Sequence, residues 1–289
     1  MKALKINIIL FTVLSIFNVT LCTKNPTIPN AVFIEPEMIV IDDNLLYTYG
    51  ATWDTSFHPP DSLKSSAVEL EPFEIGKYEL TNAEYEKFVQ DGGYDKPDFW
   101  SPEGWEFKND LNWSMPAFWS KDRLWKDDPY SKYGDTPVHG ISYYEAEAFC
   151  NWLSKKANEN YHIPTSYQWT RAAKGPDPGK KYTWGNDYHA DFAHFFCPFS
   201  DVPLEKVHEY GEGKSHEGCY NMIGNVFEVC RITHFVSSSN LSFYYSLPSL
   251  SVSGGGDPCF RTMTTTSGWS SEKSDRYFAY GLRVAKSIR

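Results

Sequence analysis

Residues 94–119 combine aromatic residues and prolines without helical or strand periodicity. The segment contains YDKPDFW, then GW, then PAFW. Because aromatic rings need buried surface and prolines interrupt regular structure, this pattern predicts a long packed loop. The whole chain extends the pattern, with 10 Trp, 19 Tyr, 19 Gly and 18 Pro in 289 residues. We therefore expect an irregular, loop-rich fold whose loops are held by aromatic anchors.

Three capping boxes predict the starts of three helices. In each box, a Ser or Thr stands three residues before a Glu or Gln. The boxes lie at residues 81–84, 142–145 and 165–168. Apolar residues at helical spacing follow each box, and Cys150 lies on the inward face of the second helix. From Lys181 onward the sequence predicts no further long helix.

Short strands are expected on either side of these helices. Residues 37–41 are mostly apolar, and residues 68–75 alternate apolar and charged side chains, which is typical of a half-exposed strand in a hairpin-like sheet. Residues 281–285 form the last expected strand. We find neither an internal repeat nor a low-complexity linker, so one domain is the simplest prediction.

The N-terminus predicts a signal peptide over residues 1–22. Lys2 and Lys5 precede an apolar run at residues 8–19, and small residues near Cys22 allow cleavage. After a short segment at residues 23–32, the folded domain is expected at residues 33–286. The rest of the sequence has no apolar span of bilayer length, so no membrane span is expected. The prediction is a protein that is secreted or held in the lumen of the secretory pathway, or in the periplasm or outside a bacterial cell.

Charge and histidine spacing argue against several classes of function. The formal net charge of -10 makes nucleic acid a poor partner, because no basic stripe is present to displace counterions from phosphates. The eight histidines are scattered and form no HExxH motif, so a zinc site lacks sequence support.

An ordered series of motifs carries a family resemblance. The motifs are PFEIGKYELTNAEYEKFV (72–89), GGYDKPDFWSPEGW (92–105), TPVHGISYYEAEAFCNWL (136–153), IPTSYQWTRAAKG (163–175), YTWGN (182–186), YNMIGNVFEV (220–229) and YGLRVA (280–285). Their order resembles the formylglycine-generating enzyme, or sulfatase-modifying factor, family. The resemblance implies a single irregular α+β domain related to C-type lectin folds.

The resemblance also implies calcium ligands in the segment GCYNMIGNVFEVCR. Asn221, Gly224, Val226 and Glu228 match the family's calcium ligands, with Gly224 and Val226 supplying carbonyl oxygens. A second calcium site would lie near Asp191 and Phe192, with a further acid such as Asp201. The alternative is structural: Asn221 and Asn225 satisfy backbone groups in a turn, while Glu228 bonds to a neighbouring loop.

The copper site that the resemblance implies is incomplete in this sequence. Family members that make formylglycine oxidise a cysteine of a sulfatase peptide with O₂, using copper held by two cysteines after a Gly-Gly-Ser segment. Two thiolates suit soft Cu(I), whereas hydroxyl or carboxylate groups do not. Here residues 253–264 read SGGGDPCFRTMT and contain only Cys259.

The other cysteines allow more than one arrangement. Without Cys22 the chain keeps five: Cys150, Cys197, Cys219, Cys230 and Cys259. Cys230 could join Cys259 as a thiol pair or, as we favour, as a disulfide, and Cys197 with Cys219 is a second candidate disulfide. Cys150 is then a buried free thiol. The sequons at Asn112 and Asn240 are candidate glycosylation sites in a eukaryotic source.

Two functions follow from these observations. The first is a non-catalytic, calcium-stabilised binding protein for a peptide, protein or glycan, and the incomplete cysteine pair favours it. The second is an exported oxidoreductase of the formylglycine-generating type, with Cys259 as its active thiol, copper as cofactor and sulfatases as substrates. Structural calcium is compatible with both.

Overall fold

The computed structural model describes most of the chain from Glu35 onward. The described residues are 35–42, 46–48, 67–177, 179–195, 203–231, 243–246, 268–278 and 280–288. Glu35–Arg289 form one compact unit. The predicted signal peptide at residues 1–22 and the segment at residues 23–32 lie outside the described residues and stay predictions.

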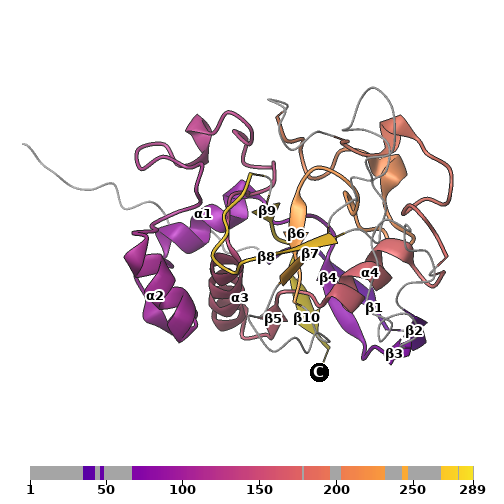
Figure 1. The fold of residues 1–289 in the computed structure, drawn as a ribbon, viewed down its shortest axis with the longest axis horizontal. Coiled ribbons are helices and arrows are strands. Elements are labelled where there is room, and N and C mark those ends of the chain that lie inside the picture. Colours follow the sequence, from indigo (N-terminus) through magenta and orange to yellow (C-terminus); the bar gives the residue numbers. More distant parts are fainter. Residues whose placement is uncertain are drawn as a thin grey trace, which may run out of the picture. The chain divides into compact units, whose positions relative to one another are not determined.

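A four-stranded antiparallel sheet joins segments from both ends of this unit (Figure 1). Its order is β1-β4-β10-β5, and the strands are β1 (Met38–Ile41), β4 (Phe73–Gly76), β10 (Ala285–Ser287) and β5 (Tyr161–His162). Ile75 pairs with Ile39 on one side and Ala285 on the other. Phe73 and Ile75 are buried, so the central strand β4 contributes directly to the core.

A second sheet has the order β8-β7-β6-β9. Its strands are β8 (Gly268–Ser271), β7 (Phe243–Ser246), β6 (Phe227–Val229) and β9 (Tyr280–Gly281). The β6–β9 pair is parallel and the other two pairs are antiparallel. β2 (Leu46–Thr48) and β3 (Ala67–Glu69) form a separate antiparallel pair. Because β9 belongs to one sheet and β10 to the other, the short connection between them links the two sheets.

The three predicted capping boxes are confirmed. Thr81, Ser142 and Thr165 are the N-caps of α1 (Asn82–Gln90), α3 (Tyr143–Ala157) and α4 (Ser166–Lys174). In each box the N-cap side chain accepts from the N3 backbone, while the N3 side chain accepts from the N-cap backbone.

Aromatic rings fill the contact between α1 and α3. The rings of Tyr85 and Phe149 are stacked with centroids 5.3 Å apart, and Phe88 meets Phe149 edge-on. All three side chains are buried. The inward face predicted for α3 is confirmed by these contacts and by the burial of Cys150.

The prediction of one packed loop at residues 94–119 is wrong. This segment contains the 3-10 helix η2 (Pro97–Phe99) and the α-helix α2 (Pro102–Asp110). Ser101 caps α2, and Pro102 occupies its first turn, where the missing N–H costs nothing. The other 3-10 helices are η3 (Trp125–Asp127), η4 (Ala190–Phe192) and η5 (Gly211–Gly213).

Two predicted strands have different bounds in the structure. The segment at 68–75 is divided between β3 and β4, because Pro72 has no N–H for a continuous ladder. The segment at 281–285 is divided between β9 and β10, and Arg283 lies in the connection. The α+β, loop-rich fold class is confirmed.

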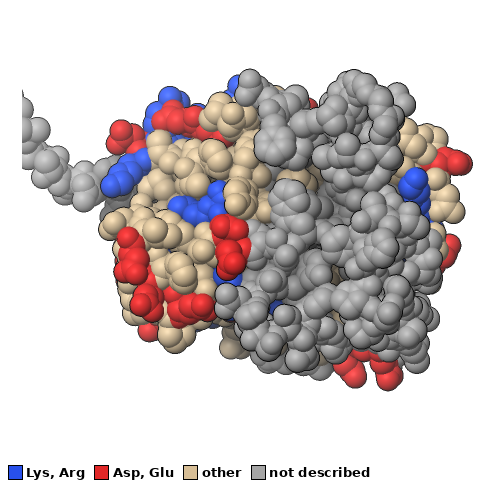
Figure 2. Space-filling view, in the orientation of Figure 1, with Lys and Arg blue, Asp and Glu red and all other residues tan. Residues whose placement is uncertain are grey.

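Charged side chains of both signs are scattered over the described part of the face in Figure 2. Acidic side chains gather on α2, where Glu103, Glu106 and Asp110 are exposed or nearly so. Across the residues that the structure places, no helix combines the length and apolar character needed to cross a bilayer.

We expect Ser142→Ala to destabilise the protein by about 1–2 kcal/mol, since it removes the cap of a buried helix. Glu145 N donates to Ser142 Oγ at 3.2 Å, and Ser142 N donates to Glu145 Oε2 at 2.8 Å. Ser101→Ala is the matched control, because Ser101 Oγ accepts only one long bond of 3.4 Å from Gly104 N. Urea unfolding measures the free energy of unfolding of both variants. An equal loss of stability in Ser142→Ala and Ser101→Ala would contradict the prediction.

Candidate functional site

The segment predicted to bind calcium forms a sharp turn leading into β6. Asn221 and Asn225 have φ values of 49° and 59°, and Gly224 has φ of 84°. A Cβ on Gly224 would lie 2.4 Å from the carbonyl oxygen of His194, so only glycine fits there. The same oxygen accepts a 3.1 Å hydrogen bond from Asn225 N. The turn is therefore packed directly against the backbone at His194.

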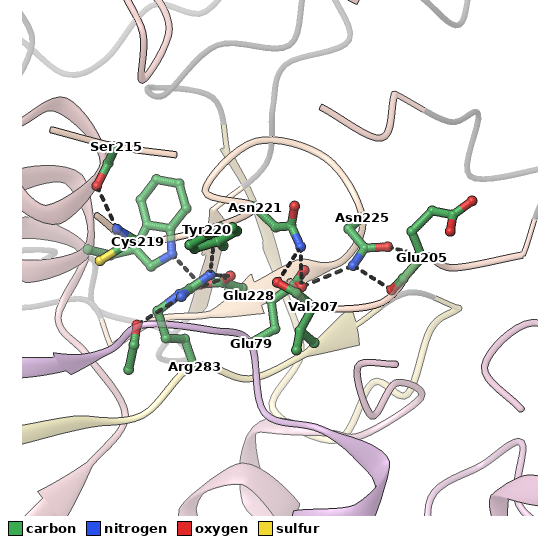
Figure 3. A network of polar contacts seen from close by, with 12 residues as sticks. Glu79, Glu205, Val207, Ser215, Cys219, Tyr220, Asn221, Asn225, Glu228 and Arg283 are labelled. Atoms are coloured by element: carbon green, nitrogen blue, oxygen red, sulfur yellow. Dashed lines mark hydrogen bonds and ion pairs between the residues drawn. The ribbon is translucent and has the colours of Figure 1, made fainter. Parts of the chain in front are cut away.

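The side chains of both asparagines converge on Glu79 (Figure 3). Asn221 Nδ2 and Asn225 Nδ2 each donate to Glu79 Oε2 at 3.0 Å. Asn225 also donates to Glu205 O at 3.2 Å and accepts from Glu205 N at 2.9 Å. Asn221 donates to Val207 O at 3.1 Å. These contacts match the structural alternative stated for the two asparagines, in which they satisfy backbone groups.

Glu228 binds Arg283, which lies in the short connection between β9 and β10. Arg283 Nη2 donates to Glu228 Oε1 at 2.7 Å, and Arg283 Nε donates to Oε2 at 3.0 Å. Trp169 Nε1, from α4, also donates to Glu228 Oε2. Arg283 is completely buried, and Glu228 is 1% exposed. The result is a buried bidentate ion pair with a third donor.

The network holds two buried carboxylates and one guanidinium. Burial and then the charge of Glu228 raise the pKa of Glu79 to about 8, although Arg283 acts in the opposite direction. Burial works against the charged form of Arg283, but Glu228 outweighs it and raises the pKa of Arg283. Glu79 Oε1 and Asn221 Oδ1 are buried and have no hydrogen-bond partner.

Sequence analysis missed Glu79 and Arg283. The available signal was a charged residue inside an apolar segment: Arg283 stands within GLRVA. A charge in such a place is buried only when it is paired. Nothing in the sequence indicated Glu228 as its partner, 55 residues away.

The contacts fit the predicted calcium set only in part. Asn221 Oδ1 is available for a cation, but the carboxylate of Glu228 already receives Arg283 and Trp169. In the second predicted set, Asp191 is exposed. The carbonyl oxygen of Phe192 lies against Gly213, where an added Cβ would be only 1.7 Å from that oxygen. Among the residues with described positions, no three His, Cys, Asp or Glu side chains are grouped to hold a metal. Calcium at either place stays a prediction.

The described cysteines are all buried. Cys150, Cys219 and Cys230 are 2%, 0% and 0% exposed, and Cys219 and Cys230 belong to one apolar cluster with Trp169 and Ile75. Burial raises the pKa of Cys219 to about 11, and burial also raises the pKa of Cys150.

Neither proposed disulfide has both of its cysteines among the described residues. Cys219 is a free thiol in the structure. Cys197 and Cys259 lie outside the described residues, as does Asn240. Both disulfide pairings and the role of Cys259 therefore stay predictions. Asn112 is exposed in the turn that follows α2, which is compatible with glycosylation at its sequon.

We expect Glu79→Gln to change how stability depends on pH. A carboxyl with a raised pKa in the folded state contributes stability that is complete below its unfolded value of 4.5 and is lost as pH rises to about 8. The glutamine does not titrate and keeps an acceptor for Asn221 and Asn225. The stability of Glu79→Gln relative to the unchanged protein should therefore rise between pH 5 and pH 8, and its relative Tm with it. The free energy of unfolding should change by at most about 1.4 kcal/mol per pH unit.

Thermal melts over this pH range measure the effect. Glu71→Gln removes a carboxylate from an exposed position and is the matched control. Parallel profiles for the unchanged protein and Glu79→Gln would contradict the prediction.

Three known proteins are similar in sequence to more than half of this chain. Hercynine oxygenase from Mycolicibacterium smegmatis is 31% identical over 166 residues, 56% of this chain and 37% of the relative. Formylglycine-generating enzyme from Bos taurus is 25% identical and matches 63% of this chain and 54% of its own. Inactive C-alpha-formylglycine-generating enzyme 2 from Mus musculus is 26% identical, with 56% and 58% covered. The chain thus spans little more than a third of the hercynine oxygenase.

A solved structure described as CarF shares the fold. It has a TM-score of 0.58 and 18% identity, covering 88% of this chain and 99% of that chain. The enzyme names among the relatives give no support to the expectation of a non-catalytic binding protein. The profile of the sulfatase-modifying factor enzyme 1-like domain matches residues 24–288, and the chain therefore belongs to the family of sulfatase-modifying factors and formylglycine-generating enzymes.

Proposed function

We propose that this chain is a binding protein on the family scaffold that does not carry out copper-dependent cysteine oxidation. The observation that supports the proposal is the burial of Cys230, which is 0% exposed within an apolar cluster. Cys230 is the thiol that the sequence offers as a partner for Cys259 in a copper pair completed from outside the loop.

The chemistry of copper explains why this burial matters. Cu(I) is held by thiolates, and a site for a substrate cysteine must leave an open coordination position. Cys230 is buried in a cluster with Ile75, Trp169 and Met222, and a buried thiol is poorly placed to hold a metal that must also meet a substrate cysteine. Cys219 lies in the same cluster, and its raised pKa disfavours the thiolate at neutral pH. Both cysteines are better suited to packing than to catalysis.

The ligand in this proposal is a peptide, protein or glycan outside the cytosol. The predicted signal peptide supports export, and the family description, which refers to sulfatases, makes a sulfatase-derived peptide the first ligand to test. The acidic side chains over α2 in Figure 2 favour a ligand without a large negative charge.

A second candidate function is an oxidoreductase with Cys259 as the active thiol. The names of the relatives favour it, since both hercynine oxygenase and formylglycine-generating enzyme are enzyme names. One name in the same set contains the word inactive, so the scaffold accommodates both outcomes. A copper-loading assay separates the two candidates.

We expect no conversion of a cysteine-containing sulfatase peptide to its aldehyde when the purified chain is supplied with Cu(I) and O₂. The reason is that a single thiolate is a poor site for Cu(I). Mass spectrometry of the peptide measures the product, and Cys259→Ser is the matched control. Copper-dependent aldehyde that Cys259→Ser fails to make would establish the second candidate instead.

Alkylation in the native state tests the burial of the other thiols. Cys150 and Cys219 should react with iodoacetamide only after denaturation, because both are buried and hold their protons tightly. Peptide mapping before and after guanidinium treatment measures the difference. Rapid native labelling of Cys219 would argue against a purely structural thiol.

A further inference from the structure

Arg283 is buried in full and surrounded by oxygen atoms. Its guanidinium donates to both carboxylate oxygens of Glu228 at 2.7–3.2 Å. It also donates from Nη2 to Tyr220 O at 2.7 Å and from Nη1 to Gly76 O at 2.8 Å. One fixed positive charge is thus held by a bidentate carboxylate and two backbone carbonyls (Figure 3).

These acceptors are of the kind that calcium uses. A calcium ion in a protein takes carboxylate and carbonyl oxygens, with a bidentate glutamate as a common ligand. Glu228 belongs to the predicted calcium set, and Tyr220 immediately precedes Asn221 in the same segment. In this structure Arg283 uses the carboxylate, and Trp169 donates to it as well. A metal at Glu228 would therefore compete with both donors for the same two carboxylate oxygens.

Asn221 uses its amide nitrogen in this network and leaves its amide oxygen without a hydrogen bond. Its Nδ2 donates to Glu79 Oε2 and to Val207 O. Because an amide is planar, Oδ1 lies on the side facing away from Glu79, as Figure 3 shows. Oδ1 is thus the one group of its side chain that Asn221 could offer a cation, and without the Glu228 carboxylate the segment lacks the bidentate acid that calcium commonly uses.

Charge gives a third argument. A divalent ion that shared Glu228 with Arg283 would place two cations on one carboxylate, and like charges repel strongly in a buried site. Arg283 and Glu228 are 0% and 1% exposed as side chains, so water screens the repulsion poorly.

We infer that Arg283 is the built-in cation of the Asn221–Glu228 segment, which folds without calcium at this place. The guanidinium neutralises Glu228 and binds the two carbonyls, and Asn221 and Asn225 close the turn on Glu79. This inference does not rest on the proposed function, because it concerns only the segment's cation.

Calcium titration tests the inference directly. The purified chain is treated with EGTA, and its Tm and heat of binding are measured with and without calcium chloride. We expect the same Tm in both conditions and no binding heat from this segment. The matched variant is Asn221→Gly, which tolerates the positive φ of 49° and removes the amide.

The outcomes separate cleanly. A calcium-dependent rise in Tm that Asn221→Gly loses would overturn the inference, since the ion then uses the predicted ligand. A rise in Tm that Asn221→Gly retains places the ion elsewhere and agrees with the inference. The variant Asp191→Asn then tests whether the ion binds at the second predicted set.

A double-mutant cycle tests Arg283 itself. Arg283→Met leaves Glu228 buried and unpaired, so its Tm should fall well below that of the double variant Arg283→Met with Glu228→Gln. If Arg283→Met does not fold, Arg283→Lys replaces it, keeping the charge but losing the planar fork. A double variant no more stable than either single one would show that the two residues are not coupled as proposed.

Discussion

The buried pair of Arg283 and Glu228 connects the parts of this fold that the sequence places far apart. Arg283 lies between β9 of one sheet and β10 of the other, and Glu228 lies in β6. The guanidinium also binds the carbonyl of Gly76 at the end of β4. Such a pair adds little stability compared with an apolar core, but loss of one partner costs about 3–5 kcal/mol because the other charge stays buried. The pair and the Gly76 bond therefore join β6 of one sheet to β4 of the other through Arg283.

Local signals predicted the helices well and the strands less well. The capping boxes at Thr81, Ser142 and Thr165 specify helix starts by bonds within four residues, so sequence alone contains the information. α2 was missed because its signal is weaker: Ser101 lacks the Glu or Gln that completes a box, and the surrounding aromatic residues suggested a loop. The strands are short and paired across long separations, as with Ile75 and Ala285, and their bounds depend on partners that no local pattern reveals.

The site was predicted as a segment but not as a set of contacts. The asparagines and the glycine were correctly singled out as a special turn, since positive φ at Asn221, Gly224 and Asn225 demands those residue types. Their partner Glu79 is 142 residues from Asn221, and a ligand list transferred by resemblance contains no such residue. The same transfer assigned Glu228 to a metal, whereas the fold supplies a guanidinium for it. A motif therefore located the polar centre, and only the tertiary structure shows that Arg283 binds Glu228 there.

Family membership fixes the scaffold more firmly than the chemistry. The polar network of Glu79, Glu228 and Arg283 supports the turn and both sheets, and it needs no substrate to be useful. Relatives named as enzymes and one named as inactive share this family, which is expected when function resides in groups added to a common fold. In this chain the buried thiols of Cys219 and Cys230 are packed into the core between α4 and β4. The two-thiolate copper site of the formylglycine-generating type is incomplete in the sequence itself, since residues 253–264 contain Cys259 as their single cysteine and one sulfur is a weaker ligand for Cu(I) than two.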